Sequence, residues 1–431
     1  MFKKYIAFIC AILLMVCGVV ACGPTEVPSE SSADATTTVT DATTQVTTTE
    51  STEATTDVVT DATADVTTDA TTDGTTAATT TKVTTTAKPT TTTTTKPTTA
   101  SPYSENNIEF YGRFLKSADG WQFDWSGSAI EAGFNGTKVE LQINLVGGAN
   151  TDYFNVYIDG GEPTMLTVEK AQDWYTLAED LPKGYHWVRL EKRTEGPQGA
   201  ICEFVQFDFP KGKAAPAPAR KTRFIEFMGD SITAAYGNVA GNGWSGFKLI
   251  EEDFANSYGA LTAKNLNAYA TVLGWSGGGM YQDLGGNKTT VFSNNIFWRT
   301  LARKDKKDWT FAQKPDVLVI NLGTNDFASG CDGEQYSICY EDFLKELRKI
   351  YPDTHIVCTM GIIGVGYNAN DYIKDAITYS GIDNVSFFMM FVDNDVVPES
   401  EKWGADGHPS AKAHAEMANQ LSAHIAEQMG W

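Results

Sequence analysis

The sequence predicts an all-β sandwich followed by a three-layer α/β/α sandwich with a mostly parallel sheet. Between residues 103 and 209, short β-prone runs alternate with turn residues and show no helical period. After residue 223, strand-like runs alternate with helical ones, and 316–322 is a fully apolar run of the kind buried in parallel sheets. We therefore expect functional side chains at the carboxyl ends of the parallel strands.

The chain begins with an apparent export signal. A basic pair, Lys3 and Lys4, precedes the apolar run 5–20, which has the length of a signal-peptide core and is short for a membrane-spanning helix. The run ends in Val-Val-Ala-Cys, which resembles the lipobox of bacterial lipoproteins. This resemblance implies that 1–21 is a signal peptide and that Cys22 carries a lipid on the outer face of the cell membrane. The alternative is a secretory peptide cleaved just before Cys22, which leaves a free thiol.

Residues 22–102 are expected to form a disordered linker. From about residue 24 they are nearly all Thr, Ala, Asp, Val and Pro, without any aromatic residue. Such a segment cannot bury enough apolar surface to offset its ordering entropy. We expect an extended spacer, open to O-glycosylation, that holds the folded part away from the membrane.

Charge and cysteine content narrow the possible functions. The net charge of −21 argues against nucleic-acid binding, which needs a basic face, and is compatible with a neutral polysaccharide. Cys331 and Cys339 are close enough in sequence to bridge a loop, whereas Cys358 lies in an apolar run typical of a buried thiol. With five histidines and no Cys-x-x-Cys pattern, we expect no metal site. We also expect a monomeric protein.

The first folded part is expected to span 103–212. Its candidate strands alternate apolar and polar positions, and Gly- and Pro-containing turns separate them; they are 138–145, 153–158 and 185–190. A jelly-roll sandwich fits this pattern. The Pro- and Ala-rich stretch 213–222 then predicts a linker.

The second folded part is expected to span 223–431. Its candidate strands are 223–228, 268–273, 316–322, 355–360 and 386–392, and its candidate helices are 257–265, 341–351 and 409–428. Pro352 ends the second helix.

A serine follows the first of these strands, in the run Gly229-Asp230-Ser231-Ile232-Thr233. At this position its hydroxyl and its backbone N–H both face the crevice at the sheet edge. A hydroxyl becomes a useful nucleophile only when a neighbouring base takes its proton. The competing interpretation is that these residues only cap a helix.

Three further segments follow other strands or precede the last helix. The Gly-rich run 274–280 lets backbone N–H groups approach a ligand oxygen, and the Asn325 amide is a donor for a developing negative charge. His408 is suited to exchange a proton near neutral pH. Each also has an ordinary explanation: the Gly-rich run forms a turn, Asn325 is a local cap in a turn, and His408 is a surface residue.

The order of the four segments resembles the four blocks of the SGNH hydrolase family over 223–431. The resemblance implies that Ser231 is the nucleophile and that His408 is the general base and later the acid. It also implies an oxyanion hole made by the N–H groups of Ser231 and Gly277 and the amide of Asn325, with Gly279 as the alternative to Gly277.

One feature departs from that family pattern. An aspartate usually lies three residues before the histidine, but Ala405 occupies this position and Asp406 lies two residues before. We expect Asp406 to complete a Ser-His-Asp triad. The alternative is a Ser–His dyad in which a backbone carbonyl orients the ring.

The sandwich narrows the resemblance to carbohydrate esterase family 2. The segments 123–131 and 134–137 resemble that family's N-terminal domain, and 276–279 and the Asp-Gly-His-Pro spacing resemble its catalytic domain. With them, the resemblance covers nearly all of 103–431. It implies a serine esterase without a cofactor that removes O-acetyl groups from plant polysaccharides such as xylan and glucomannan, and some family members use a dyad.

Two tryptophans are candidate sugar platforms. Trp275 and Trp403 adjoin the oxyanion-hole and histidine segments, although a core position explains Trp403 equally well. Two other functions remain open. One is an SGNH enzyme acting on a lipid, a thioester or peptidoglycan, and the other is a carbohydrate-binding surface protein with an inert hydrolase fold.

Overall fold

The computed structural model describes residues 107–431 except 242 and 244. The expected signal peptide 1–21, the lipidation site Cys22 and the spacer 22–102 therefore lie outside the described residues. Within the described part, no helix has the length and apolar character needed to span a bilayer. The described residues all belong to one compact unit.

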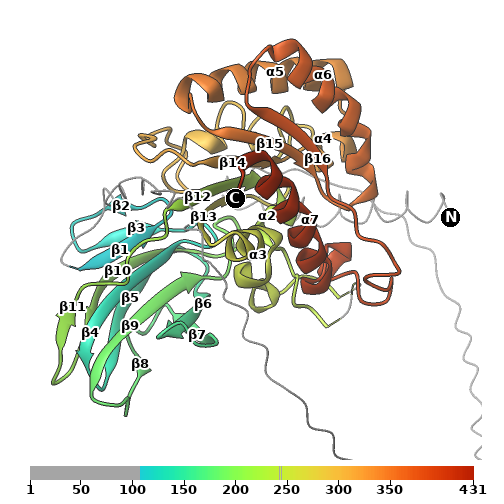
Figure 1. Ribbon diagram of the computed structural model, residues 1–431. Coiled ribbons are helices and arrows are strands. Elements are labelled where there is room, and N and C mark those ends of the chain that lie inside the picture. The colour runs from blue at the N-terminus through green and yellow to red at the C-terminus, as the bar shows by residue number, and fades with distance from the viewer. Residues whose placement is uncertain (1–106, 242, 244) are drawn as a thin grey trace, which may run out of the picture. The chain divides into compact units, whose positions relative to one another are not determined.

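The first folded part is a sandwich of two antiparallel sheets (Figure 1). One sheet has the order β1-β4-β9-β6-β7, with β11 paired to β4, and the other has the order β2-β3-β10-β5-β8. The strands are β1 (Ile108–Tyr111), β2 (Leu115–Lys116), β3 (Trp121–Phe123), β4 (Ala129–Gly136), β5 (Val139–Gly148), β6 (Thr151–Ile158), β7 (Thr164–Glu169), β8 (Trp174–Ala178), β9 (Gly184–Lys192), β10 (Ala200–Asp208) and β11 (Lys213–Ala215).

Alternation along the strands builds the core between these two sheets. In β5, Val139, Leu141, Ile143 and Leu145 are buried, and the residues between them are partly exposed. Strand β11 begins the stretch for which we expected a linker, because Lys213–Ala215 pairs with β4.

The second folded part contains a five-stranded parallel sheet with the order β13-β12-β14-β15-β16. Its strands are β12 (Arg223–Gly229), β13 (Ala268–Gly274), β14 (Val317–Asn321), β15 (His355–Met360) and β16 (Val385–Met389). The helices are α2 (Ser231–Ala234), α3 (Tyr258–Asn265), α4 (Thr324–Ala328), α5 (Gly333–Ile350), α6 (Asn370–Ser380) and α7 (Ala411–Met429). Short 3₁₀ turns are η1 (Leu249–Glu251), η2 (Phe254–Asn256), η3 (Ile296–Trp298), η4 (Gly364–Ala369) and η5 (Ala405–Gly407).

Helices cover both faces of this sheet (Figure 1). Val317 and Val319 of β14 belong to the core that includes α3 and α7, whereas Leu318 and Ile320 belong to the core that includes α5 and α6. Both faces of β14 are therefore buried, which explains its uninterrupted apolar sequence. The predicted three-layer sandwich is confirmed.

Three details differ from the expectations. Helix α5 begins at Gly333 rather than near 341, because Asp332 caps it by accepting the N–H groups of Glu334 and Gln335. Helix α6 was not predicted at all. Cys331 and Cys339, candidates for a bridge, are both free thiols.

Buried polar contacts join the sandwich to the parallel-sheet part. The Asp124 carboxylate accepts the N–H groups of Ala302 at 2.8 Å and Arg303 at 2.9 Å. The indole N–H of Trp125 donates to the Thr300 carbonyl at 3.0 Å, and its ring belongs to the core formed with α5 and α6. These contacts fix sandwich residues against the loops that follow β13.

Candidate active site

Ser231 lies where β12 ends and α2 begins. Asp230 caps α2, since its Oδ1 accepts the Ile232 N–H at 2.9 Å. Gly229 permits the close turn, because a Cβ there would lie 2.1 Å from Thr233 Oγ1. The cap and the nucleophile are thus different residues: Asp230 closes the helix end, and Ser231, 7% exposed, is left to face the crevice.

His408 contacts Ser231 directly, with Nε2 2.8 Å from Oγ. Its Nδ1 lies 3.3 Å from the Ala405 carbonyl oxygen. A carbonyl only accepts, so Nδ1 carries the proton and Nε2 offers its lone pair to the Ser231 hydroxyl. Burial lowers the pKa of His408 to about 4, against a smaller opposing effect of the Ala405 carbonyl. The ring is therefore neutral at neutral pH, so Nε2 is free to accept a proton.

Asp406 has a different role from the one expected. Its Oδ2 accepts the Tyr236 hydroxyl at 3.1 Å and the Phe247 N–H at 3.2 Å. It lies in the turn η5 with φ at 49°, and the carboxylate is used to hold these two groups rather than the ring. The structure corrects the expected triad to a Ser–His dyad in which the Ala405 carbonyl orients the ring.

Tyr236 is a site residue that sequence analysis did not identify. Its ring centroid lies 4.4 Å from that of His408 and 4.0 Å from that of Phe247, with which it stacks. Asp406 therefore supports the base indirectly, through the aromatic pair that packs on the imidazole. No local sequence signal marks Tyr236, because this packing depends on a turn 170 residues away.

The oxyanion-hole candidates follow the two strands that flank β12. Gly277 follows β13, has φ at +80°, and its N–H has no acceptor among the described residues. The N–H groups of Gly278 and Gly279 are already bonded to backbone carbonyls at 2.9 and 3.2 Å. This difference favours Gly277 over Gly279. Asn325, which follows β14, donates one amide hydrogen to the Gly278 carbonyl at 2.8 Å and has a second available.

Asp326 holds these two loops together. Its carboxylate accepts the N–H groups of Met280, Tyr281 and Gln282 at 3.0, 2.8 and 2.9 Å. The loop after β13 is thus tied to α4, which carries Asn325. Sequence analysis did not identify this cross-link.

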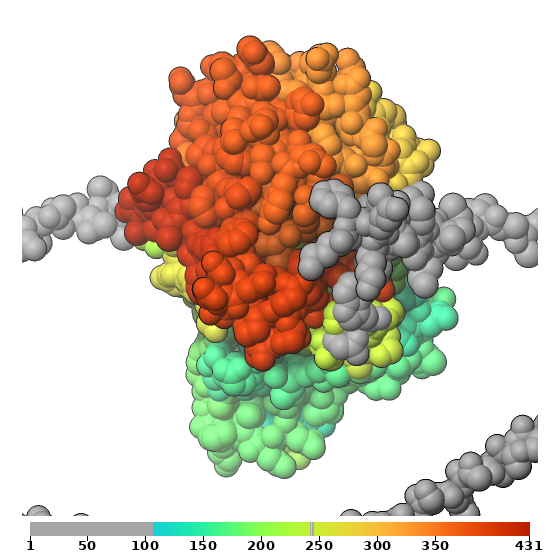
Figure 2. Space-filling view, turned by 90° about the vertical axis from the view of Figure 1, so that its right-hand side faces the viewer, coloured from blue at the N-terminus to red at the C-terminus, as the bar shows by residue number. Residues whose placement is uncertain are grey.

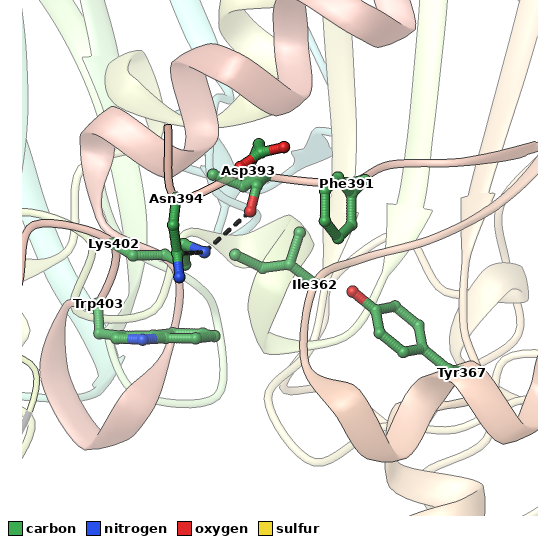
Figure 3. A pocket seen from close by; sticks show the side chains of 8 residues that line it. Ile362, Tyr367, Phe391, Asp393, Asn394, Lys402 and Trp403 are labelled. Atoms are coloured by element: carbon green, nitrogen blue, oxygen red, sulfur yellow. Dashed lines mark hydrogen bonds between the residues drawn. The ribbon is translucent and has the colours of Figure 1, made fainter. Parts of the chain in front are cut away.

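A pocket of about 300 Å³ lies beside the dyad segment. Its lining residues are Ile362, Tyr367, Phe391, Val392, Asp393, Asn394, Lys402 and Trp403 (Figure 3). Phe391 and Val396, which follow β16, are both exposed. In Figure 2 the C-terminal part of the chain, drawn in orange and red, forms much of the face toward the viewer. Ser231 and His408 do not line this pocket, but Trp403, which does, pairs through its backbone with Pro409, the residue after His408.

The two candidate sugar platforms have different environments. Trp403 lines the pocket, and its indole N–H donates to Glu399 Oε1 at 2.7 Å. Trp275 does not line it: the Arg299 guanidinium lies 5.3 Å from its ring centroid, and Trp125 lies 6.4 Å away. Trp275 therefore packs at the junction with the sandwich. Across the described residues, no group of His, Cys, Asp and Glu side chains is arranged to hold a metal ion.

Both folded parts match known families. Residues 110–218 match the family described as carbohydrate esterase 2 N-terminal, and residues 227–416 match the GDSL-like lipase/acylhydrolase family. A cellulase/esterase, CelE, from Acetivibrio thermocellus is 36% identical over 341 residues, which are 77% of this chain and 41% of CelE. The chain thus spans about two fifths of the length of that relative.

Two further proteins extend this similarity. An acetylxylan esterase/glucomannan deacetylase from Cellvibrio japonicus is 26% identical over 76% of this chain and 90% of its own length. The structure of a family two carbohydrate esterase from Clostridium thermocellum, in complex with cellohexaose, is 34% identical. It covers 75% of this chain and 99% of its own, with a TM-score of 0.69. On the matches to both domains and to this structure, the chain belongs to carbohydrate esterase family 2.

Proposed function

We propose that the protein is an extracellular serine esterase that removes O-acetyl groups from plant cell-wall polysaccharides such as xylan and glucomannan. The observation that carries the proposal is the 2.8 Å contact between Ser231 Oγ and His408 Nε2 at the carboxyl edge of the parallel sheet. Two relatives from Cellvibrio japonicus, each an acetylxylan esterase/glucomannan deacetylase, support this substrate class.

The dyad performs the first half of the reaction. As Ser231 Oγ bonds to the acetyl carbonyl carbon, its proton passes to His408 Nε2. The carbonyl oxygen becomes negative and accepts from the N–H groups of Ser231 and Gly277 and from the Asn325 amide. When the sugar C–O oxygen leaves, the His408 imidazolium gives it the proton, and the free sugar hydroxyl departs.

Water completes the cycle. His408 takes a proton from water as the water oxygen attacks the acetyl-enzyme carbonyl carbon. The same oxyanion donors stabilise the second tetrahedral intermediate. Collapse of this intermediate returns the proton to Ser231 Oγ and releases acetate. Every proton transfer uses residues of this chain.

The pocket beside the dyad suits a sugar ring. Trp403 supplies a flat face, and Asp393, Asn394 and Lys402 supply polar groups around it (Figure 3). Lys402 Nζ already donates to the Val392 carbonyl at 2.9 Å and to Asn394 Oδ1, so its position is fixed before substrate binds. We propose that a pyranose of the polysaccharide stacks on Trp403 while its acetyl group reaches Ser231.

We propose that the enzyme is a monomeric lipoprotein tethered through Cys22 and the Thr-rich spacer. The lipobox-like run before Cys22 supports the anchor, and the spacer composition supports reach away from the membrane. A Cys22→Ser protein should move from the membrane fraction to the medium or the soluble fraction. Retention in the membrane fraction would contradict the lipid anchor.

The decisive experiment measures acetate release from acetylated xylan and acetylated glucomannan by the wild type and by Ser231→Ala. Release by the wild type alone supports both the substrate class and the nucleophile, and the ratio of the two rates ranks the glycans. Long-chain esters and O-acetylated peptidoglycan serve as comparison substrates. No release from the two glycans, together with turnover of one of these comparison substrates, would overturn the proposed substrate class.

A further inference from the structure

The buried carboxylate of Glu195 reaches from the sandwich to the oxyanion loop. Glu195 follows β9 and is fully buried. Its Oε2 accepts the Ser276 N–H at 2.7 Å, and its Oε1 accepts the Ser276 hydroxyl. Ser276 directly precedes Gly277, so the carboxylate holds the residue on which the free Gly277 N–H depends.

The segment that carries Glu195 is itself fixed on the parallel-sheet part. The Arg193 carbonyl accepts the Phe254 N–H at 3.0 Å, and the Arg193 guanidinium lies 3.0 Å from the Asp253 carboxylate. On the other side of Glu195, Arg303 donates to the carbonyls of Gly196 and Pro197 at 2.9 and 2.7 Å. Contacts on both sides therefore prevent the Glu195 backbone from shifting independently of the oxyanion loop.

The buried Glu195 carboxylate depends on its hydrogen bonds to Ser276 for stabilisation. Burial raises the pKa of Glu195 to about 7, while the Ser276 donors and the nearby Lys192 ammonium lower it. Lys192 is itself paired with Asp152 at 3.0 Å, and the carboxyl of Glu252, also fully buried, lies beside the Glu195 backbone. Among the described residues, Ser276 supplies every hydrogen bond to the Glu195 side chain. A buried carboxylate is costly unless donors compensate it, so the fold keeps Ser276 aimed at Glu195.

We propose that Glu195 is a positioning residue of the oxyanion hole. By holding both donors of Ser276, it fixes the peptide unit between Ser276 and Gly277 and aims the Gly277 N–H at the oxyanion. The inference rests on the proposed function, because it concerns the same tetrahedral intermediate. It makes the sandwich a part of the catalytic unit rather than a separate binding module.

Glu195→Met in the full-length chain is the direct test. Gln would not serve, because its N–H₂ group can donate to the Ser276 hydroxyl, which also accepts; the Met thioether keeps nearly the same length but replaces neither bond to Ser276. Because a misaimed oxyanion donor acts on the transition state, we expect kcat for 4-nitrophenyl acetate to fall about 10- to 100-fold. We expect KM to change less than about threefold, since the ground-state ester gains little from this donor.

A tetrahedral adduct gives a readout that a merely structural role would not move. Phenylboronic acid bonds to the serine oxygen and places a negative tetrahedral group in the oxyanion hole, so its inhibition should weaken by about the same factor as kcat. Glu203→Met is the matched control, because Glu203 is also a buried sandwich glutamate but accepts from Gln122 within the sandwich at 3.0 Å. This variant should keep the wild-type kcat and inhibition.

Ser276→Ala covers the case in which Glu195→Met fails to fold. It removes only the hydroxyl bond and leaves the N–H bond, so kcat should fall by a smaller factor, again with KM nearly unchanged. A folded Glu195→Met with wild-type kcat and boronic acid inhibition, or a Ser276→Ala with both unchanged, overturns the inference alone. A wild type that hydrolyses no acetate ester overturns the proposed function and this inference together.

Discussion

The dyad predicts that Asp406→Asn will leave most of the activity intact. In a triad, the carboxylate sets the histidine tautomer, and the same substitution costs about 10⁴-fold in kcat. Here the Ala405 carbonyl faces Nδ1 at 3.3 Å and sets the tautomer without any side chain. The Asp406 carboxylate instead binds the Tyr236 hydroxyl and the Phe247 N–H.

The size of the effect follows from those two bonds. An asparagine Oδ1 accepts both donors, so the substitution exchanges charged acceptors for neutral ones. That exchange lowers the free energy of unfolding by about 1–2 kcal/mol. Asparagine also tolerates the left-handed backbone of residue 406, whose φ is 49°. We expect kcat to fall by less than about tenfold, through a slightly looser Tyr236 ring on His408.

The assay is steady-state hydrolysis of 4-nitrophenyl acetate and acetylated xylan by folded Asp406→Asn, with thermal unfolding measured in parallel. Tyr236→Phe is the matched variant, because it removes the hydroxyl that binds Asp406 but keeps the ring stacked on His408. It should resemble Asp406→Asn in kcat. A fall of 10³-fold or more in Asp406→Asn alone would refute the dyad and restore the carboxylate to the ring.

Three further predictions concern the oxyanion, the base and the sugar. Asn325→Ala should lower kcat about 10²- to 10³-fold by removing an oxyanion donor, and an unchanged kcat for 4-nitrophenyl acetate would remove Asn325 from the oxyanion hole. Only neutral His408 accepts the serine proton, so kcat/KM should fall as the pH drops through the His408 pKa of about 4. The titratable groups that face His408 are those of Tyr236, Asp406 and His414. Because the pKa of Glu195 is about 7, the pH profile should also be measured in Glu195→Gln, which lacks this titrating group. A midpoint near 6.5 in that variant would contradict the lowering of the His408 pKa by burial. Trp403→Ala should raise KM for acetylated polysaccharide more than for 4-nitrophenyl acetate, and equal effects on both would exclude stacking on this ring.

Local sequence patterns predicted the fold because the order of apolar and polar residues in a strand reflects which of its two faces are buried. β14 is apolar on both faces, as expected for a strand covered on both sides, and the β5 sequence alternates because one of its faces is covered. Ser231, Asn325 and His408 were identifiable for a related reason. Each lies next to a strand end or a helix start, where parallel topology brings separate segments together.

The supporting residues were not predictable in this way. Glu195 and Ser276 are 81 residues apart and belong to different folded parts, so no spacing rule joins them. Asp406 was expected on the ring because of its sequence distance from His408, but the direction of its carboxylate depends on a left-handed residue in η5. The start of α5 was missed because the cap, Asp332, is followed by Gly333, a poor helix former.

Support of the oxyanion hole by Glu195 and support of the His408 ring by Asp406 differ in importance for the reaction. A buried histidine whose pKa is lowered is a weak base, so proton transfer from Ser231 is favourable only if the developing oxyanion is well stabilised at the same moment. Precise aim of the Gly277 N–H then limits the rate more than fine adjustment of the His408 ring, which already has its tautomer fixed by a backbone carbonyl. Glu195→Met should therefore cost more in kcat than Asp406→Asn, although neither side chain is placed against the substrate. The reverse order would mean that orientation of the base, rather than of the oxyanion donors, limits catalysis in this site.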